Sequence, residues 1–214
     1  MHVILDNLDT FTKALGVTVA LTLLSFAGAF LVGAALAAAR VSPVPPLRQA
    51  AAVLTELFRN IPLVVLLFLL YFGIPKIDIR FSPFITAVIG MSLYTGAYMG
   101  ETIRSGINSV AVGQAEAARS LGLGFGQVLG IVVLPQALRT VVQPIGNLFS
   151  AHAKNTAIAA SISVKDLTYQ ANRLGQENAD AIATLLAVGM VYVVVLLGAG
   201  YGFAVLERRT AIRR

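Results

Sequence analysis

The sequence predicts an all-α membrane protein, formed by one transmembrane domain over residues 1–214 with five transmembrane helices. Two observations lead to this fold class. First, 57% of the residues are hydrophobic and 12% are charged, against about 25% charged in an average soluble domain; the mean hydropathy is +0.81. Second, several almost uncharged runs reach the roughly 20 residues that a helix needs to cross the hydrocarbon core of a bilayer.

Five apolar runs define the predicted spans. The first and the last contain no charged residue, so each can lie in lipid without burying a charge. The second run includes Glu56, Arg59 and Pro62, and the fourth is interrupted by Pro135 and Pro144. The first run follows an acidic stretch and is too long for a signal peptide, so we expect it to remain in the protein. The spans are expected at about residues 14–39, 49–73, 81–103, 131–153 and 181–206.

The basic residues predict the orientation of the chain. Five spans place the two termini on opposite sides of the membrane, and the side richer in Lys and Arg is normally cytoplasmic. One side has five basic residues: Lys13, Lys76, Arg80, Lys165 and Arg173. The other has nine: Arg40, Arg48, Arg104, Arg119, Arg139, Arg208, Arg209, Arg213 and Arg214. We therefore expect the N-terminus outside, and the C-terminus and the polar segment at about 108–130 in the cytoplasm.

The composition and the absence of motifs disfavour several functional classes. The chain has no Cys, and His2 and His152 lie far apart, so we expect no disulfide and no metal site. It contains no G-x-x-x-x-G-K-[ST] phosphate loop, no HExxH motif and no Ser-His-Asp arrangement. A net charge of +6 would suggest nucleic-acid binding in a soluble protein. Here the basic residues lie at the ends of apolar runs, so membrane topology explains them better. We expect neither an enzyme nor a nucleic-acid-binding protein.

The most distinctive segment is EAARSLGLGFGQVLGIVVLP, residues 116–135, which lies between two apolar runs. Its beginning predicts a short helix in which Glu116 and Arg119 are spaced to pair across one turn. Ala117 and Ala118 would leave a smooth surface for close packing by another protein, and Gly122 would end the helix. An ordinary amphipathic connector, rich in Ala for helix propensity, is the alternative interpretation.

This segment resembles the EAA loop of binding-protein-dependent ABC importer permeases. Three further stretches, residues 56–75, 92–107 and 135–156, resemble the polar amino acid branch of these permeases, of the glutamate or glutamine type. The similarity extends over about residues 11–206. Val132 stands where the family commonly has Ile, a difference of one methylene group.

The resemblance implies the type I ABC importer permease fold with a cytoplasmic coupling helix, in a bacterial inner membrane. The implied partners are two ABC ATPase subunits, a second permease subunit of the same or a related kind, and an extracytoplasmic amino-acid-binding protein. ATP and Mg would be bound by the ATPase, so this chain itself would need no cofactor. The residues expected to couple it to the ATPase are Glu116, Ala117, Ala118, Gly122, Leu134 and Pro135.

The candidate substrate-binding residues are polar or small residues at apolar or interrupted stretches, because ionisable groups inside a membrane are costly and usually functional. The alternatives are an ion pair of Glu56 with Arg59, a pair of Glu101 with Arg104 or another Arg, and ordinary packing of Tyr94 and Tyr98. His152 is expected to be a polar packing residue. The candidates are Arg59, Asn60, Tyr94, Gly96, Glu101, Lys154, Asn155 and Thr156.

The charges of these candidates indicate the kind of substrate. Members of the branch resemble one another in a Lys, then Asp or Asn, then a hydroxyl residue, here Lys154, Asn155 and Thr156. A neutral Asn155 beside Arg59 and Lys154 favours an acidic or amide side chain: glutamate, glutamine or aspartate. Two other functions remain as alternatives: a stand-alone ion-coupled transporter or channel, and a non-transporting partner subunit of a heteromeric permease.

Overall fold

A computed structural model describes residues 6–210, with side chains as far as residue 205. The side chains of Arg208 and Arg209, and all of Arg213 and Arg214, lie outside this range. The regular structure in the described range is helical: α2 (Leu8–Val41), α3 (Pro45–Asn60), α4 (Leu63–Phe68), a π-helical turn (Leu69–Gly73), a 3₁₀ turn (Ile74–Ile77), α5 (Pro83–Asn108), α6 (Val112–Ser120), α7 (Phe125–Gln127), a π-helical turn (Val128–Val133), α8 (Leu134–Asn155), a 3₁₀ helix (Thr156–Ile162), α9 (Leu167–Glu177) and α10 (Ala181–Thr210).

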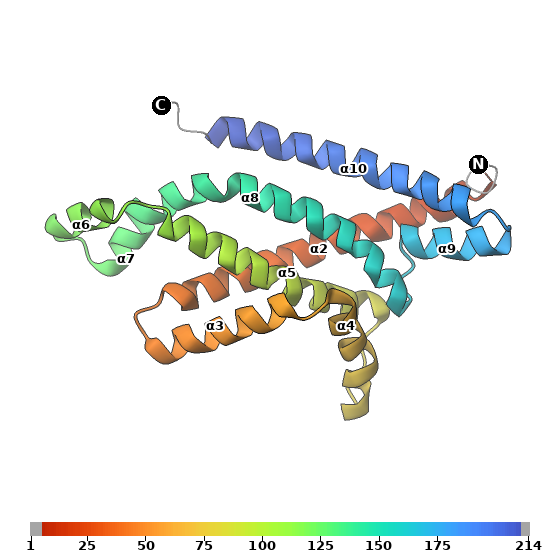
Figure 1. Ribbon diagram of the computed structural model, residues 1–214, viewed down its shortest axis with the longest axis horizontal. Helices are drawn as coiled ribbons and strands as arrows, with labels where there is room; N and C mark the ends of the chain where they lie inside the picture. The colour runs from red at the N-terminus through yellow and green to blue at the C-terminus, as the bar shows by residue number, and fades with distance from the viewer. Residues whose placement is uncertain (1–5, 211–214) are drawn as a thin grey trace.

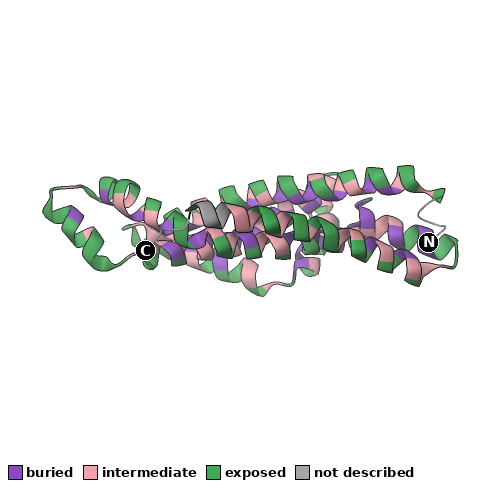
Figure 2. Cartoon of the chain, turned by 90° about the horizontal axis from the view of Figure 1, so that it is seen from above, coloured by how far each residue is buried: buried purple, intermediate pink, exposed green. Residues whose placement is uncertain are grey.

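The long helices run along one axis of an elongated bundle (Figure 1). α6 and α7 protrude at one end of it, and α9 lies at the opposite end near the start of the chain. α5 contacts α2, α3, α4 and α8, so it is the central helix. Buried residues concentrate between the helices, whereas the outer faces are exposed (Figure 2).

Small residues let α2 and α5 pack closely. A Cβ at Gly33 would lie 2.6 Å from Met99 Cβ and 2.9 Å from the backbone nitrogen of Gly100. A Cβ at Gly96 would lie 2.7 Å from a methyl group of Val32. Close backbone approach at small residues is a common way for membrane helices to associate. Gly96, a candidate substrate residue, therefore faces α2.

His152 connects three helices inside the bundle. Its ring nitrogens lie 2.8 Å from the Ser25 hydroxyl on α2 and 2.8 Å from the Thr95 hydroxyl on α5, while His152 itself belongs to α8. The side chain is 1% exposed. A buried polar group with both nitrogens satisfied stabilises one arrangement of these helices, and this placement agrees with the expected packing role.

The number of transmembrane helices differs from the predicted five. By length and composition, three helical stretches among the described residues qualify as membrane spans: Leu8–Val41, Phe125–Ile162 and Ala181–Val205. A fourth qualifies if α3 and the helix from Leu63 to Ile77 count as one broken span. The count of five is therefore not confirmed. The remaining predicted span is α5, which is helical but carries many small and polar residues, since it packs against other helices rather than lipid.

The predicted second span, residues 49–73, is not one straight helix. It divides at Ile61 and Pro62, and the two halves are bent by 103°. Pro62 has no N–H to donate and forces the preceding residue into an extended conformation; Ile61 has ψ of 133° accordingly. As a result α4 points away from the bundle axis (Figure 1).

Candidate functional site

A polar cavity opens between α3, α5 and α8, with a volume of about 520 Å³. α3 contributes Arg59, α5 contributes Tyr98 and Glu101, and α8 contributes Pro144. Hydroxyl groups complete the polar part of the lining: Thr102, Ser105, Ser109 and Thr140. This size falls within the range of pockets that hold small molecules, about 300–1,000 Å³. A guanidinium, a carboxylate and several hydroxyl groups converge here, so this lining can hydrogen-bond a small molecule that carries charges of both signs.

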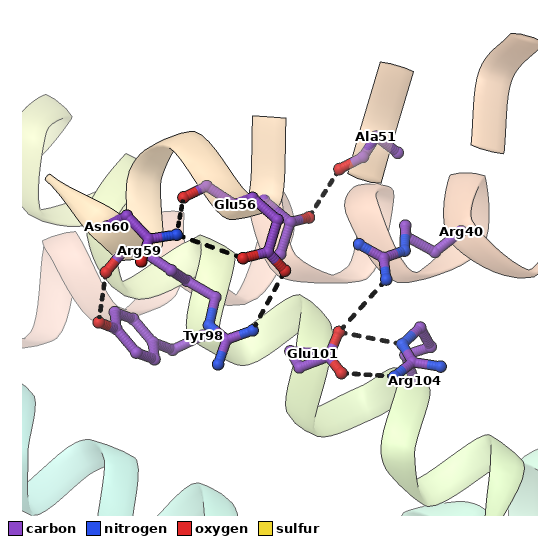
Figure 3. A network of polar contacts seen from close by, with 9 residues as sticks. Arg40, Ala51, Glu56, Arg59, Asn60, Tyr98, Glu101 and Arg104 are labelled. Carbon is purple, nitrogen blue, oxygen red and sulfur yellow. Dashed lines mark hydrogen bonds and ion pairs between the residues drawn. The ribbon is translucent and has the colours of Figure 1, made fainter. Parts of the chain in front are cut away.

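Arg59 lies at the end of α3, directly before the break at Pro62. Its guanidinium is 5.4 Å from the centre of the Tyr98 ring, and the Tyr98 hydroxyl donates a hydrogen bond of 2.9 Å to the Arg59 carbonyl. Nη1 lies 3.7 Å from Glu56 Oε1, and Nε is buried without a hydrogen-bond partner. Figure 3 shows these contacts. The distant pairing with Glu56 leaves guanidinium N–H groups from which a carboxylate could accept hydrogen bonds, although the buried Nε is out of its reach.

Glu101 faces two arginines. Arg104 Nε donates to Glu101 Oε2 at 3.0 Å, and Arg40 Nη2 from α2 lies 3.8 Å from the same oxygen (Figure 3). This is the pairing that the sequence left open as the alternative to substrate contact. Because two cations face one carboxylate, the charge of Glu101 is fully balanced inside the bundle.

The other candidate substrate residues lie elsewhere. Lys154 is exposed, Asn155 is partly buried and Thr156 is buried, with its hydroxyl bonded to Ala153 O at 2.7 Å. Asn60 is exposed and its amide donates back to Glu56 O at 2.7 Å. Tyr94 packs against Tyr98, with the ring centres 5.3 Å apart. Of the eight candidates, Arg59 and Glu101 line the cavity; the structure separates them from the Lys154–Thr156 group.

Tyr98 and the cavity hydroxyls were not among the candidate residues. Spacing provides the signal that would have identified them, since positions 98, 101, 102, 105 and 109 follow a helical repeat of three or four residues. They share one face of α5, and Glu101 marks that face as polar. The contributions of α8 had no comparable signal.

The segment expected to couple to the ATPase, at about residues 108–130 and called the coupling segment below, contains two short helices, α6 and α7, at one end of the bundle. Ala118 is buried in a small apolar cluster with Val128 and Val133, which holds α6 against the end of the bundle. Glu116 and Ala117 are exposed on the other face of α6. Figure 2 shows that this end of the molecule is mostly exposed. α6 therefore has one face packed on the bundle and one face exposed, and docking of the ATPase on the exposed face stays a prediction.

Gly122 ends α6 as the sequence predicts. Its φ is +84°, the left-handed conformation that favours glycine, and its N–H bonds to Arg119 O at 2.8 Å. Leu121 beside it is 82% exposed. Leu134 and Pro135 follow the π-helical turn Val128–Val133 inside the continuous helical stretch Phe125–Ile162, so Pro135, which has no N–H, lies where the hydrogen-bond pattern changes from π to α. Among the described residues, Glu116 and Arg119 form no ion pair; both are exposed to water, where such a pair gains little.

An all-helical bundle with several apolar spans, a polar cavity and a protruding helical segment defines a membrane transport component. The chain belongs to the family of binding-protein-dependent transport system inner membrane components, which matches residues 29–212. The predicted family is therefore confirmed, and the chain is a multi-pass membrane protein of this kind.

Relatives with curated names match almost the whole chain. A probable glutamine ABC transporter permease protein, GlnM of Bacillus subtilis, is 33% identical and covers 98% of this chain and 97% of its own length. The glutamate transport system permease protein GluC of Corynebacterium glutamicum is 35% identical, covering 94% of each chain. The L-cystine transport system permease protein TcyB of Bacillus subtilis is 36% identical, covering 90% of this chain and 82% of its own.

Solved structures share the fold. An amino acid ABC transporter crystallised with histidines has a chain 30% identical to this one, with a TM-score of 0.90 and 96% of both chains covered. The MetNI methionine ABC transporter in an inward-facing conformation has a TM-score of 0.82 at 17% identity, covering 97% of this chain and 99% of its own. The predicted helical ABC permease fold is confirmed, apart from the number of spans.

Proposed function

We propose that this chain is the membrane permease subunit of an ATP-driven importer of glutamate, glutamine or aspartate. The observation that carries this proposal is its similarity, along nearly the whole chain, to permeases named for glutamine and glutamate. The polar cavity inside an apolar bundle supports it. The similar L-cystine permease makes the choice of amino acid an experimental question.

The cavity offers a route for recognising such a substrate. The Arg59 guanidinium lines the cavity and pairs only distantly with Glu56, at 3.7 Å, so its accessible N–H groups could bind a carboxylate. Glu101 would accept hydrogen bonds from the α-ammonium group, and these would replace part of its pairing with Arg40 and Arg104. The cavity and its immediate surroundings then carry more positive than negative charge, which favours an anionic or amide side chain over a cationic one.

The Lys154–Thr156 group does not line this cavity. We keep it as a second candidate recognition site, positioned at the end of α8 toward α9. A substrate moving along the bundle would meet it at a different stage from Arg59. Because Asn155 does not lie beside Arg59, the proposed preference for acidic or amide side chains rests on the cavity.

The energy source belongs to partner subunits in this proposal. Two ATPase subunits, which bind ATP and Mg, would dock on the exposed face of α6 in each of two permease subunits, either identical or related. This chain would then not be an enzyme. Movement of α6 would be transmitted through Gly122 and α7 to α8, switching the cavity between the two sides of the membrane.

The same proposal sets the orientation. The coupling segment would face the cytoplasm of a bacterial cell, with the N-terminus outside and the C-terminus inside. α9, at the opposite end of the bundle from α6, would lie on the outer side, where an amino-acid-binding protein delivers substrate (Figure 1). Positive residues near the α6 end support this choice.

The test is transport by the reconstituted complex. The chain is purified with its ATPase, placed in vesicles and supplied with its binding protein, and uptake of glutamate, glutamine, aspartate, arginine and cystine is measured with and without ATP. ATP-dependent uptake of the first three is expected. Ion-driven uptake without an ATPase would support a stand-alone transporter instead, and docking without uptake would indicate a non-transporting partner subunit.

A further inference from the structure

A second cavity, of about 430 Å³, lies where α2 and α5 meet the coupling segment. Three arginines from three elements line it: Arg40 from α2, Arg104 from α5 and Arg119 from α6. Asn108 adds an amide, and the rest of the wall is largely apolar, including Phe125. No acidic side chain is among the described residues that line this cavity.

The positive charge of this cavity is only partly balanced. Glu101, which lines the first cavity, pairs closely with Arg104 and lies 3.8 Å from Arg40. One carboxylate therefore faces two guanidinium groups, and Arg40 Nη1 is buried without a hydrogen-bond partner. Arg119 is exposed and has no ion pair among the described residues. An anion in this cavity would balance the positive charge that Glu101 leaves uncompensated.

We propose that this cavity binds the phosphate group of an anionic molecule, and that an anionic phospholipid headgroup fits it best. Guanidinium groups bind phosphate oxygens with paired hydrogen bonds, and three of them from separate elements surround one space. Phe125, Val128 and Leu129 beside them form an apolar wall suited to the glycerol and acyl part of a lipid. Free phosphate would bind the arginines but would make no use of the apolar wall.

The bound phosphate would connect the coupling segment to the bundle. Arg119 belongs to α6, whereas Arg40 and Arg104 belong to the long helices, so one anion would bridge parts that otherwise meet mainly through the Ala118 cluster. The effect on coupling rests on the proposed function. The binding itself does not, and it is measured separately.

The first experiment measures lipid binding to the complete permease–ATPase complex by native mass spectrometry, comparing phosphatidylglycerol with neutral phosphatidylcholine. We expect selective retention of phosphatidylglycerol. Arg119→Gln should weaken it about fivefold, the effect of one basic residue near an anionic group, and Arg119→Lys should restore most of it. Arg139→Gln, which removes an exposed arginine outside the cavity, is the matched control and should leave retention unchanged.

The source of the phosphate and the specificity of the cavity are decided by two further comparisons. Inorganic phosphate is titrated against the lipid: displacement at millimolar concentration would support the same phosphate chemistry with a soluble ligand. If Arg139→Gln loses as much lipid retention as Arg119→Gln, the protein attracts anionic lipid through its overall positive charge, and the proposal is overturned. Unchanged lipid retention in Arg119→Gln together with loss of the ATPase would also overturn it, because the arginine would then serve a protein contact.

Transport in vesicles links binding to coupling. The fraction of phosphatidylglycerol needed for half-maximal ATP-driven uptake should rise about fivefold in Arg119→Gln, with no change in Arg139→Gln. Lipid binding that follows the prediction without any transport activity would leave the site standing and refute the importer assignment. Transport that ignores lipid composition, with no selective retention, would refute the site and leave the importer assignment standing.

Discussion

Replacing Gly122 tests the coupling segment, because the structure separates backbone strain from steric clash at this position. Its φ is +84°, and no atom lies within 4 Å of where a Cβ would be. Gly122→Ala therefore adds no collision, and its cost is the left-handed backbone alone. That cost is roughly 1–2 kcal/mol, which shifts a conformational equilibrium by roughly 5- to 30-fold.

The expected result is weaker binding of the ATPase with an intact bundle. The turn at Gly122 positions α6, whose exposed face is proposed to dock the ATPase, so Gly122→Ala should weaken this association by up to about 30-fold. Gly122→Asn should fall between Gly and Ala, since Asn tolerates the left-handed region better. Gly122→Val should be worse than Ala because a β-branched residue is disfavoured there. Thermal unfolding of the helical bundle should not change.

The assay is titration of the permease in lipid with purified ATPase, followed by the ratio of amino acid transported to ATP hydrolysed. Gly126→Ala is the matched control, because a Cβ there also meets nothing within 4 Å and no positive φ is required. Equal effects of Gly122→Ala and Gly126→Ala would refute the strain argument. An Asn variant as impaired as Ala would do the same.

Three further predictions concern the substrate cavity, the helix packing and a buried carboxyl group. Arg59→Gln should lower ATP-driven glutamate uptake at least about tenfold, because a charge-assisted hydrogen bond is lost, and should lower glutamine uptake less. The control is Arg80→Gln, which changes an exposed residue outside the cavity and should alter neither uptake. Gly33→Ala should destabilise the bundle by about 1–3 kcal/mol and so lower its unfolding temperature in detergent, because the added Cβ would lie 2.9 Å from the Gly100 backbone. Gly189→Ala is the control and should leave the unfolding temperature unchanged, because its Cβ would meet nothing within 4 Å. Burial raises the pKa of Asp166, which lies outside the membrane spans, to about 6, so its protonated form favours the folded state. That stabilisation, of roughly 3 kcal/mol, is complete below about pH 4 and is lost as the pH rises through about 6. Unfolding temperatures measured at about pH 5 and about pH 8 should therefore differ in the wild type and agree in Asp166→Asn, which keeps the helix-capping oxygen; equal pH dependence in both would contradict this explanation.

Local features of the chain were predictable because each depends on neighbouring residues. Uncharged runs of sufficient length form α2 and α10, since lipid or a helical partner accepts either face. Gly122 ends α6 at a positive φ, as a glycine after a short helix indicates. Even the place of the bend is marked in the sequence by Asn60, Ile61 and Pro62, but its angle of 103° is not.

The candidate site was only partly predictable. Arg59 and Glu101 stood out as ionisable residues in apolar surroundings, and both line the cavity. Tyr98, expected only to pack, and the cavity hydroxyls were not among the candidates, because their helical spacing identifies a shared face of α5 only once Glu101 is taken to mark that face as polar. Lys154, Asn155 and Thr156 resemble a family pattern, yet they lie at the end of α8, away from this cavity.

The sequence by itself determined the helical class, the first and last apolar spans and the family, since these follow from composition, span length and one loop motif. Tertiary packing decided which charges meet. Arg40 and Glu101 pair because glycines bring α2 against α5, and Arg59 meets Tyr98 because the break at Pro62 ends α3 beside it. Such contacts join residues dozens of positions apart, and their geometry depends on helix crossing, which no local pattern encodes.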